Sequence, residues 1–130
     1  MSYYMSKLAS GPFDAVVTAV AAQLKARGFG VLSDIDVQAV LKAKLGADTP
    51  KYRILGVCNP RFAYDALKLE GRLGVLLPCN LIVRETADHK IEVGSIDPVS
   101  SLERTGNPAL KSMAEEVRRL LSESIERVGA

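Results

Sequence analysis

Residues 52–60, YRILGVCNP, carry an apolar strand pattern that runs directly into a helix start. Residues 52–57 favour a strand, and Asn59 followed by Pro60 is typical of a helix N-terminus. Proline fixes its own φ angle and pushes the preceding residue into the extended geometry that a capping residue needs. We therefore expect a strand over residues 52–57 and a helix from Pro60 to about Leu69.

Upstream of this stretch, the pattern predicts four further elements. Residues 2–8 can form a strand. Apolar residues spaced by three and four then predict a helix over residues 12–28. Residues 29–35 favour a second strand, after which Asp36 can cap a short helix over residues 37–45.

Downstream, two apolar strands and a long helix complete the chain. Residues 81–84 and 91–96 are joined by a short polar turn, and this spacing predicts a hairpin. Asp97 and Pro98 are expected to stop the last strand. A second Asn-Pro pair, Asn107 with Pro108, begins a long amphipathic helix. Two long helices that bracket hairpin-joined strands indicate an α+β fold with an antiparallel sheet and short helices inserted between strands.

The composition of the chain excludes several classes of protein. Its 130 residues are 48% apolar and 25% charged, which fits one globular domain over residues 1–130 and excludes a disordered or collagen-like chain. Two cysteines are too few for a disulfide-rich secreted scaffold. A net charge of +2 without a basic run, together with only four Tyr, three Phe and no Trp, argues against nucleic-acid binding.

Neither the N-terminus nor any apolar stretch suggests export or membrane insertion. Residues 1–8 lack a basic region followed by an apolar run, and no apolar stretch approaches the ~20 residues that span a bilayer. We therefore expect a cytoplasmic protein with no membrane partner, in which both cysteines are reduced thiols.

The two cysteines occur in related settings and carry the functional hypotheses. Each lies at an edge of an apolar strand beside an Asn and a Pro, in Val-Cys58-Asn59-Pro60 and in Pro78-Cys79-Asn80. If the two strands are neighbours, both sulfurs could face one pocket. Cys58 also precedes a predicted helix N-terminus, whose partial positive charge would favour a thiolate if the sulfur is exposed.

Three chemistries follow from such a pocket: soft-metal binding, persulfide or disulfide redox, and nucleophilic attack by one cysteine. A purely structural role competes with them, because a free cysteine often behaves as a small buried hydrophobe. The spacing of the two cysteines matches neither a redox C-x-x-C pair nor a zinc finger. The only histidine, His89, falls in the predicted hairpin turn, which argues against a Cys-His mechanism.

Two weaker candidates for a site remain. Asp34 and Asp36 would point to the same side of an extended strand and could hold a hard cation or exchange protons, although Asp36 also suits a helix cap. Tyr52, Arg53 and Tyr64 lie near the Cys58 segment in the sequence. They could line a ligand pocket or could be half-buried packing residues.

Four runs of sequence together resemble the bacterial and archaeal "domain of unknown function 302" family. They are residues 28–37, residues 52–64 with their Cys-Asn-Pro motif, residues 76–80 with Pro-Cys-Asn, and residues 96–98. The resemblance implies a TATA-binding-protein-like α+β fold, with a curved antiparallel sheet packed against helices, and a homodimer. It implies no established reaction. The family positions that carry over are Asp36, Cys58, Asn59, Pro60, Pro78, Cys79 and Asn80.

We therefore expect an uncharacterised cytoplasmic binding module that forms a homodimer. Its pocket, edged by Cys58 and Cys79, would take a small molecule, a sulfur species or a soft metal such as Cu(I), and we expect no bound cofactor. Strand edges and the apolar residues 73–77 are the candidate dimer surface. The alternatives are a thiol-dependent enzyme that uses Cys58 or Cys79, favoured less because no histidine accompanies either cysteine, and a structural or oligomeric protein without a thiol role.

Overall fold

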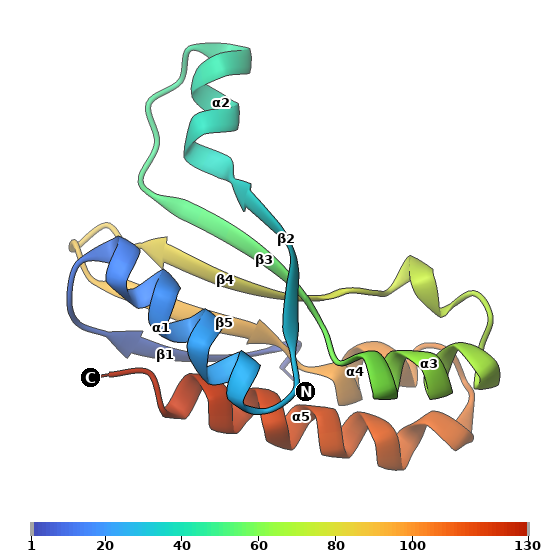
Figure 1. Cartoon of the computed structure of the whole chain (residues 1–130). Coiled ribbons are helices and arrows are strands. Elements are labelled where there is room, and N and C mark those ends of the chain that lie inside the picture. Colours follow the sequence, from blue (N-terminus) through green and yellow to red (C-terminus); the bar gives the residue numbers. More distant parts are fainter. Residues whose placement is uncertain (1, 130) are drawn as a thin grey trace.

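The computed structural model describes residues 2–129. The first and last residues of the predicted domain, residues 1 and 130, lie outside the described residues. Within the described part, no helix is both long enough and apolar enough to cross a bilayer. The elements, in chain order, are β1 (Tyr4–Ala9), α1 (Phe13–Ala26), β2 (Gly30–Asp36), α2 (Val37–Leu45), β3 (Tyr52–Cys58), α3 (Pro60–Leu69), the 3-10 turn η1 (Leu73–Val75), β4 (Cys79–Glu85), β5 (Ile91–Ile96), α4 (Pro98–Glu103), the 3-10 turn η2 (Pro108–Leu110) and α5 (Lys111–Glu126) (Figure 1).

The five strands form one sheet in the order β1-β5-β4-β3-β2, and every neighbouring pair is antiparallel. The long helices α1 and α5 lie side by side on one face of this sheet (Figure 1). In the described residues the opposite face carries no helix. The predicted antiparallel α+β architecture is therefore confirmed, and the alternation of side chains along each strand separates a covered face from an open face.

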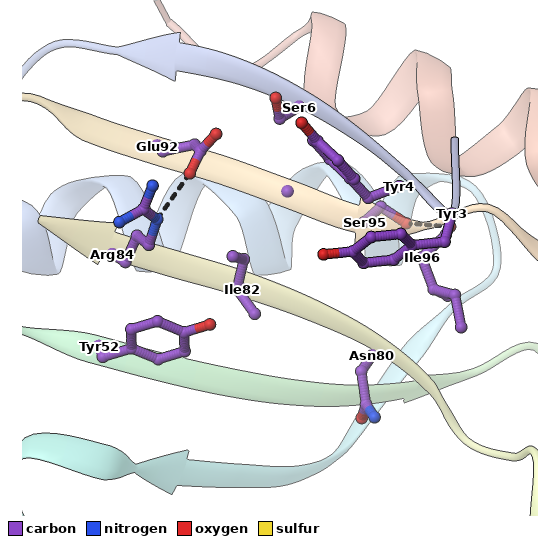
Figure 2. A pocket seen from close by; sticks show the side chains of 11 residues that line it. Tyr3, Tyr4, Ser6, Tyr52, Asn80, Ile82, Arg84, Glu92, Ser95 and Ile96 are labelled. Atoms are coloured by element: carbon purple, nitrogen blue, oxygen red, sulfur yellow. Dashed lines mark hydrogen bonds and ion pairs between the residues drawn. The ribbon is translucent and has the colours of Figure 1, made fainter. Parts of the chain in front are cut away.

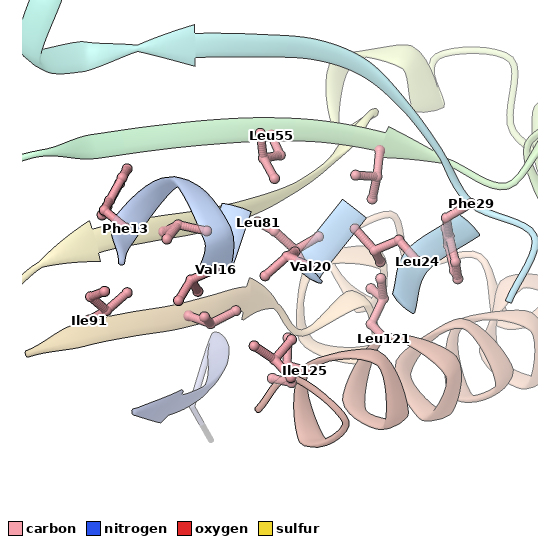
Figure 3. Close-up of a cluster of buried hydrophobic side chains, with 14 of the residues drawn as sticks. Phe13, Val16, Val20, Leu24, Phe29, Leu55, Leu81, Ile91, Leu121 and Ile125 are labelled. Carbon is pink, nitrogen blue, oxygen red and sulfur yellow. The ribbon is translucent and has the colours of Figure 1, made fainter. Parts of the chain in front are cut away.

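The main core fills the space between the sheet and the two long helices (Figure 3). Helix α1 contributes a stripe at spacings of three and four, and alternate residues of the three central strands complete the layer. The fully buried side chains of this layer include Val20, Leu24, Leu55, Leu81, Val93 and Leu121. Burying a large aliphatic side chain contributes about 1.5 to 3 kcal/mol, so this layer is the main source of stability.

A second buried cluster lies beyond the ends of β3 and β4. It joins α3, η1, α4, η2 and α5 through Ala66, Leu73, Leu102, Leu110 and Ala114. Because α5 contributes to both clusters, it ties this smaller layer to the main core. This arrangement leaves a cavity between the strand ends and the helices, where the candidate site is found.

Local capping signals placed most helix boundaries correctly. The Asp36 carboxylate accepts a hydrogen bond from the Ala39 amide at 3.0 Å and caps α2, which ends at Gly46 with a φ of +66°. Asn59 caps α3 as predicted. One helix was missed: Asp97 and Pro98 do stop β5, but they also begin α4, because the Asp97 carboxylate accepts from the Val99 amide at 2.9 Å.

Strand β2 is the edge of the sheet, and α2 at its end projects from the body of the molecule (Figure 1); we call residues 30–45 the arm. No side chain of β2 or α2 is buried. An isolated helix of this length is marginal in water, since helix stability in proteins comes mostly from packing an apolar face. Because none of its side chains is buried, the arm presents apolar residues to its surroundings, including Leu32 and Leu45.

Candidate functional site

A mostly apolar cavity of about 310 Å³ lies at the carboxyl end of β3 and the start of β4, and we call it the cysteine pocket. Its walls come from α3, α4, α5 and the Leu77–Pro78 segment. Asn59, Cys58 and Cys79 supply the polar side-chain groups among its lining residues. The apolar lining includes Phe29, Phe62, Leu73, Leu77, Met113 and Val117.

The two thiols reach the pocket from neighbouring strands, as expected, without forming a facing pair. The β3–β4 register places Cys79 opposite Val57, whereas Cys58 lies opposite Gly30 on β2. Both cysteines are free and partly buried. Both cysteines therefore line one cavity, but the one-residue offset in register keeps them from facing each other directly across the two strands.

Burial controls the acidity of both thiols. Desolvation raises the pKa of the Cys58 thiol above its ordinary value. For Cys79, desolvation, with a smaller contribution from Cys58, raises the pKa to about 11. Burial in apolar surroundings disfavours the charged form of a thiol, so both groups are neutral near pH 7.

The expected thiolate at the start of α3 depended on an exposed Cys58 sulfur, and Cys58 is partly buried. Asn59 lies between Cys58 and the helix, and its side-chain oxygen accepts from the Phe62 amide at 3.5 Å. The sulfur of Cys58 lies among the apolar side chains of the pocket, and the loss of hydration there raises the pKa of the thiol. The predicted order of acidity, with Cys58 the more acidic thiol, agrees with these pKa directions.

A glycine in β3 allows the Pro78 segment to pack close to the strand. A Cβ atom at Gly56 would collide with Ser33 Oγ and would lie 2.9 Å from Pro78 Cγ. Because Gly56 lacks that atom, Pro78 packs against β3 and leads Cys79 into β4 directly beside Val57. This close approach explains why a glycine interrupts the apolar run of residues 52–57.

The seven family positions do not form one cluster. Cys58, Asn59, Pro78 and Cys79 line the cysteine pocket. Pro60 is exposed at the first turn of α3, Asn80 lines a hollow on the open face of the sheet, and Asp36 caps α2 on the arm. The structure thus brings four of the seven together and assigns the other three to separate places.

The pair of carboxylates on β2 does not form a joint site. Asp34 makes a two-pronged ion pair with Arg53 on β3, with an Arg53 Nε to Asp34 Oδ1 distance of 2.7 Å. The hydrogen bond from Arg53 holds the pKa of Asp34 below its ordinary value. Asp36 is engaged as the cap of α2. Within residues 2–129, no group of three or more His, Cys, Asp or Glu side chains is arranged to hold a metal ion.

The aromatic and histidine candidates lie outside the cysteine pocket. Tyr52 lines the hollow on the open face of the sheet. Tyr64 is exposed on α3, and Lys68 Nζ lies 4.0 Å from its ring centroid. His89 occupies the β4–β5 turn with a φ of +62°, at the far end of β4 from Cys79. Strand β4 therefore separates the only imidazole from the thiol.

Sequence reasoning predicted a pocket between the sheet and the long C-terminal helix, which is α5, but missed the wall that α4 contributes. Pro98, Leu102, Met113 and Val117 line it from this side. One signal was present, because Asp97-Pro98 repeats the cap-and-proline pattern that identified α3. The proximity of α5 to α3 has no local signal, since it depends on packing across the chain.

Comparisons with known proteins converge on one family. The sequence profile described as "Domain of unknown function DUF302" matches residues 5–128. The crystal structure of an uncharacterized conserved protein DUF302 from Bacillus stearothermophilus has a TM-score of 0.92 and 28% sequence identity to this chain, covering 98% of this chain and 99% of that one. No functionally curated protein matches the sequence significantly.

Proposed function

We propose that this chain, which belongs to the family of domain of unknown function DUF302, binds a small, uncharged apolar molecule in the cysteine pocket. The single observation that carries this proposal is the cavity of about 310 Å³ lined by apolar side chains and only a few polar groups. Ligand pockets usually measure ~300 to 1,000 Å³ and combine an apolar lining with a few polar groups. The Asn59 amide and the two neutral thiols would orient such a ligand.

The acidity of the thiols supports binding over thiol chemistry. A nucleophile or a soft-metal ligand needs the thiolate form, and burial raises the pKa of both Cys58 and Cys79. A neighbouring imidazole could have compensated, but His89 lies at the opposite end of β4. We therefore favour a binding module over a thiol-dependent enzyme or a Cu(I) site. The free thiols fit the cytoplasmic location that we propose with it.

We also propose that the protein acts as a homodimer in which the arm, residues 30–45, contacts the second copy. The arm buries none of its own side chains, and Leu32, Ile35, Val40 and Leu45 are exposed on it. A symmetric dimer brings an identical unpartnered arm from each protomer. The segment over residues 73–77 supports this role less well, since Leu73 is buried and only Val75 is largely exposed.

A neutral dye tests the ligand proposal directly. We expect N-phenyl-1-naphthylamine to fluoresce on binding the protein and to protect Cys58 from alkylation by iodoacetamide. The variant Ala63→Phe, which fills part of the pocket from α3, should weaken dye binding at least fivefold. Ala22→Phe on the exposed side of α1 makes the same chemical change away from the pocket and should leave binding unchanged.

Two results would contradict the proposal. One is dye binding that Ala63→Phe and Ala22→Phe affect equally. The other is saturating dye that leaves the alkylation rate of Cys58 unchanged. Thermal denaturation of both variants, followed by circular dichroism, checks that each is folded before the dye is added.

A further inference from the structure

A second hollow lies on the open face of the sheet, on the side away from α1 and α5 (Figure 2). It measures about 450 Å³ and is lined by residues of β1, β3, β4 and β5, together with Tyr3. Its side chains come from the face opposite to the main core. We call it the open-face hollow, and the proposed binding in the cysteine pocket does not involve it.

The floor of the open-face hollow is apolar at its centre. Ile82 lies at its centre and pairs with Gly94 on the neighbouring strand. A Cβ atom at Gly94 would lie 3.1 Å from Ile82 Cγ1, so a side chain there would crowd Ile82 and raise the floor. The glycine therefore leaves the strand backbone beside Ile82 without a side chain that would fill the hollow.

Tyrosines flank this floor on two sides (Figure 2). Tyr52 lies on one side of Ile82, and Tyr3 lies on the other, each with its hydroxyl group directed toward the centre of the hollow. Tyr3 and Tyr4 form an aromatic pair with ring centroids 5.1 Å apart and a tilt of 60°. Tyr3 is 73% exposed, so its ring is available for contact with a ligand. Aromatic rings pack favourably against other flat π systems.

The charges in the hollow cancel. Arg84 Nε donates to Glu92 Oε1 at 2.6 Å, and among the described residues that line the hollow these two alone carry a formal charge. A neutral hollow does not favour an anion or a cation over an uncharged molecule. The Arg84–Glu92 pair also places guanidinium hydrogen-bond donors beside carboxylate acceptors. The Asn80 side-chain amide can both donate and accept hydrogen bonds.

We propose that the open-face hollow binds an uncharged planar aromatic molecule that carries an amide-like edge. The ring would lie on Ile82 and Gly94 between the tyrosines, and the edge would exchange hydrogen bonds with the Arg84–Glu92 pair or Asn80. Three features carry this assignment together: the apolar floor at Ile82 and Gly94, the inward tyrosine hydroxyls and the charge-balanced donor–acceptor pair.

Benzamide and benzoate are suitable probes because they have nearly the same shape and differ in charge. We expect benzamide, titrated into ¹⁵N-labelled protein, to shift the amide signals of Asn80, Ile82 and Gly94 while the signals of Ala66 and Leu73 in the second cluster stay in place. Benzoate should bind at least fivefold more weakly. Tyr52→Ala should weaken benzamide binding at least fivefold, whereas Tyr64→Ala, on the exposed side of α3, should not change it.

A variant that changes the charge of the hollow should reverse the order in which benzamide and benzoate bind, and this order provides a second readout. Glu92→Gln keeps the shape of the side chain but leaves Arg84 without its anionic partner, so this variant should bind benzoate more tightly than benzamide. The proposal is wrong if benzamide leaves the signals of Asn80, Ile82 and Gly94 unshifted, or if Glu92→Gln leaves the order of the two probes unchanged. It is also wrong if Tyr52→Ala converts a dimer to a monomer in sedimentation, since the face would then be covered by a second copy.

Discussion

The Asp97 carboxylate accepts a hydrogen bond from Arg118 Nε at 3.0 Å, and this contact joins the end of β5 to the middle of α5. The other carboxylate oxygen accepts from the Val99 amide and caps α4. The Asp97 side chain is 8% exposed and that of Arg118 is 47% exposed, so the aspartate is the buried partner. Together these bonds hold α4, which forms a wall of the cysteine pocket, against α5.

Replacing Asp97 should therefore lower the stability of the protein. We expect Asp97→Ala to reduce the free energy of unfolding by about 1 to 3 kcal/mol, because it removes both the cap and the ion pair. Asp97→Asn should cost less, since an asparagine can still cap α4. Urea denaturation measures both, with Asp14→Ala in the exposed first turn of α1 as the control. A loss below about 0.5 kcal/mol for Asp97→Ala would show that the contact contributes little.

The two thiols should react at different rates with iodoacetamide. Burial raises the pKa of Cys58 and raises that of Cys79 to about 11, so the thiolate fraction at a given pH is larger for Cys58. We expect Cys58 to be alkylated faster in the native protein, slowly near pH 7 and increasingly above pH 9. Mass spectrometry of the Cys58→Ser and Cys79→Ser variants assigns each rate, and faster alkylation of Cys79 would reverse the order.

Stability should decline at high pH through Cys79. The folded-state pKa of this thiol, about 11, lies above the ordinary value of 9.0, so the folded state favours the protonated thiol. The resulting stabilisation is complete below about pH 9 and is lost as the pH rises toward 11, by up to about 3 kcal/mol. Denaturation of Cys79→Ala between pH 8 and pH 11 should show a smaller decline than the parent protein. Parallel curves would contradict this assignment.

The arm should control the oligomeric state. We expect the parent protein to sediment as a dimer at micromolar concentration and the variant Val40→Asp/Leu45→Asp to sediment as a monomer, because charges would be buried at the interface. Leu45 is 75% exposed within one protomer, so these substitutions should leave the protomer folded. Val75→Asp, at an 86% exposed residue outside the arm, is the matched control. A parent protein that sediments as a monomer would remove the dimer proposal.

Local signals predicted most of the elements of this fold. Asp36 and Gly46 bound α2, Asn59 and Pro60 begin α3, and the polar turn after β4 produces the hairpin with β5. These signals work because capping and turn formation depend on residues within four positions of each other. The same reasoning applied to Asp97 and Pro98 would have found α4, so that omission was an error of interpretation and not a missing signal.

The candidate sites were only partly predictable. Cys58 and Cys79 do line one pocket, because β3 and β4 are neighbours, but the β3–β4 register and the burial of the sulfurs had no local signal. Tyr52 lies near the Cys58 segment in the sequence and could line a ligand pocket on that basis. It lies at the opposite end of β3 from Cys58 and lines the open-face hollow with Arg84 and Glu92.

The sequence by itself therefore determined the helices, most of the strands, their boundaries and the antiparallel α+β class, since these follow from periodicity and from contacts between near neighbours in the chain. Tertiary structure alone decided the strand order, the register between Cys58 and Cys79, the raised pKa of each thiol and the positions of the two hollows, one at the ends of β3 and β4 and one on the open face of the sheet. Desolvation and pocket shape depend on every group that packs around a site, and those groups come from residues far apart in the chain.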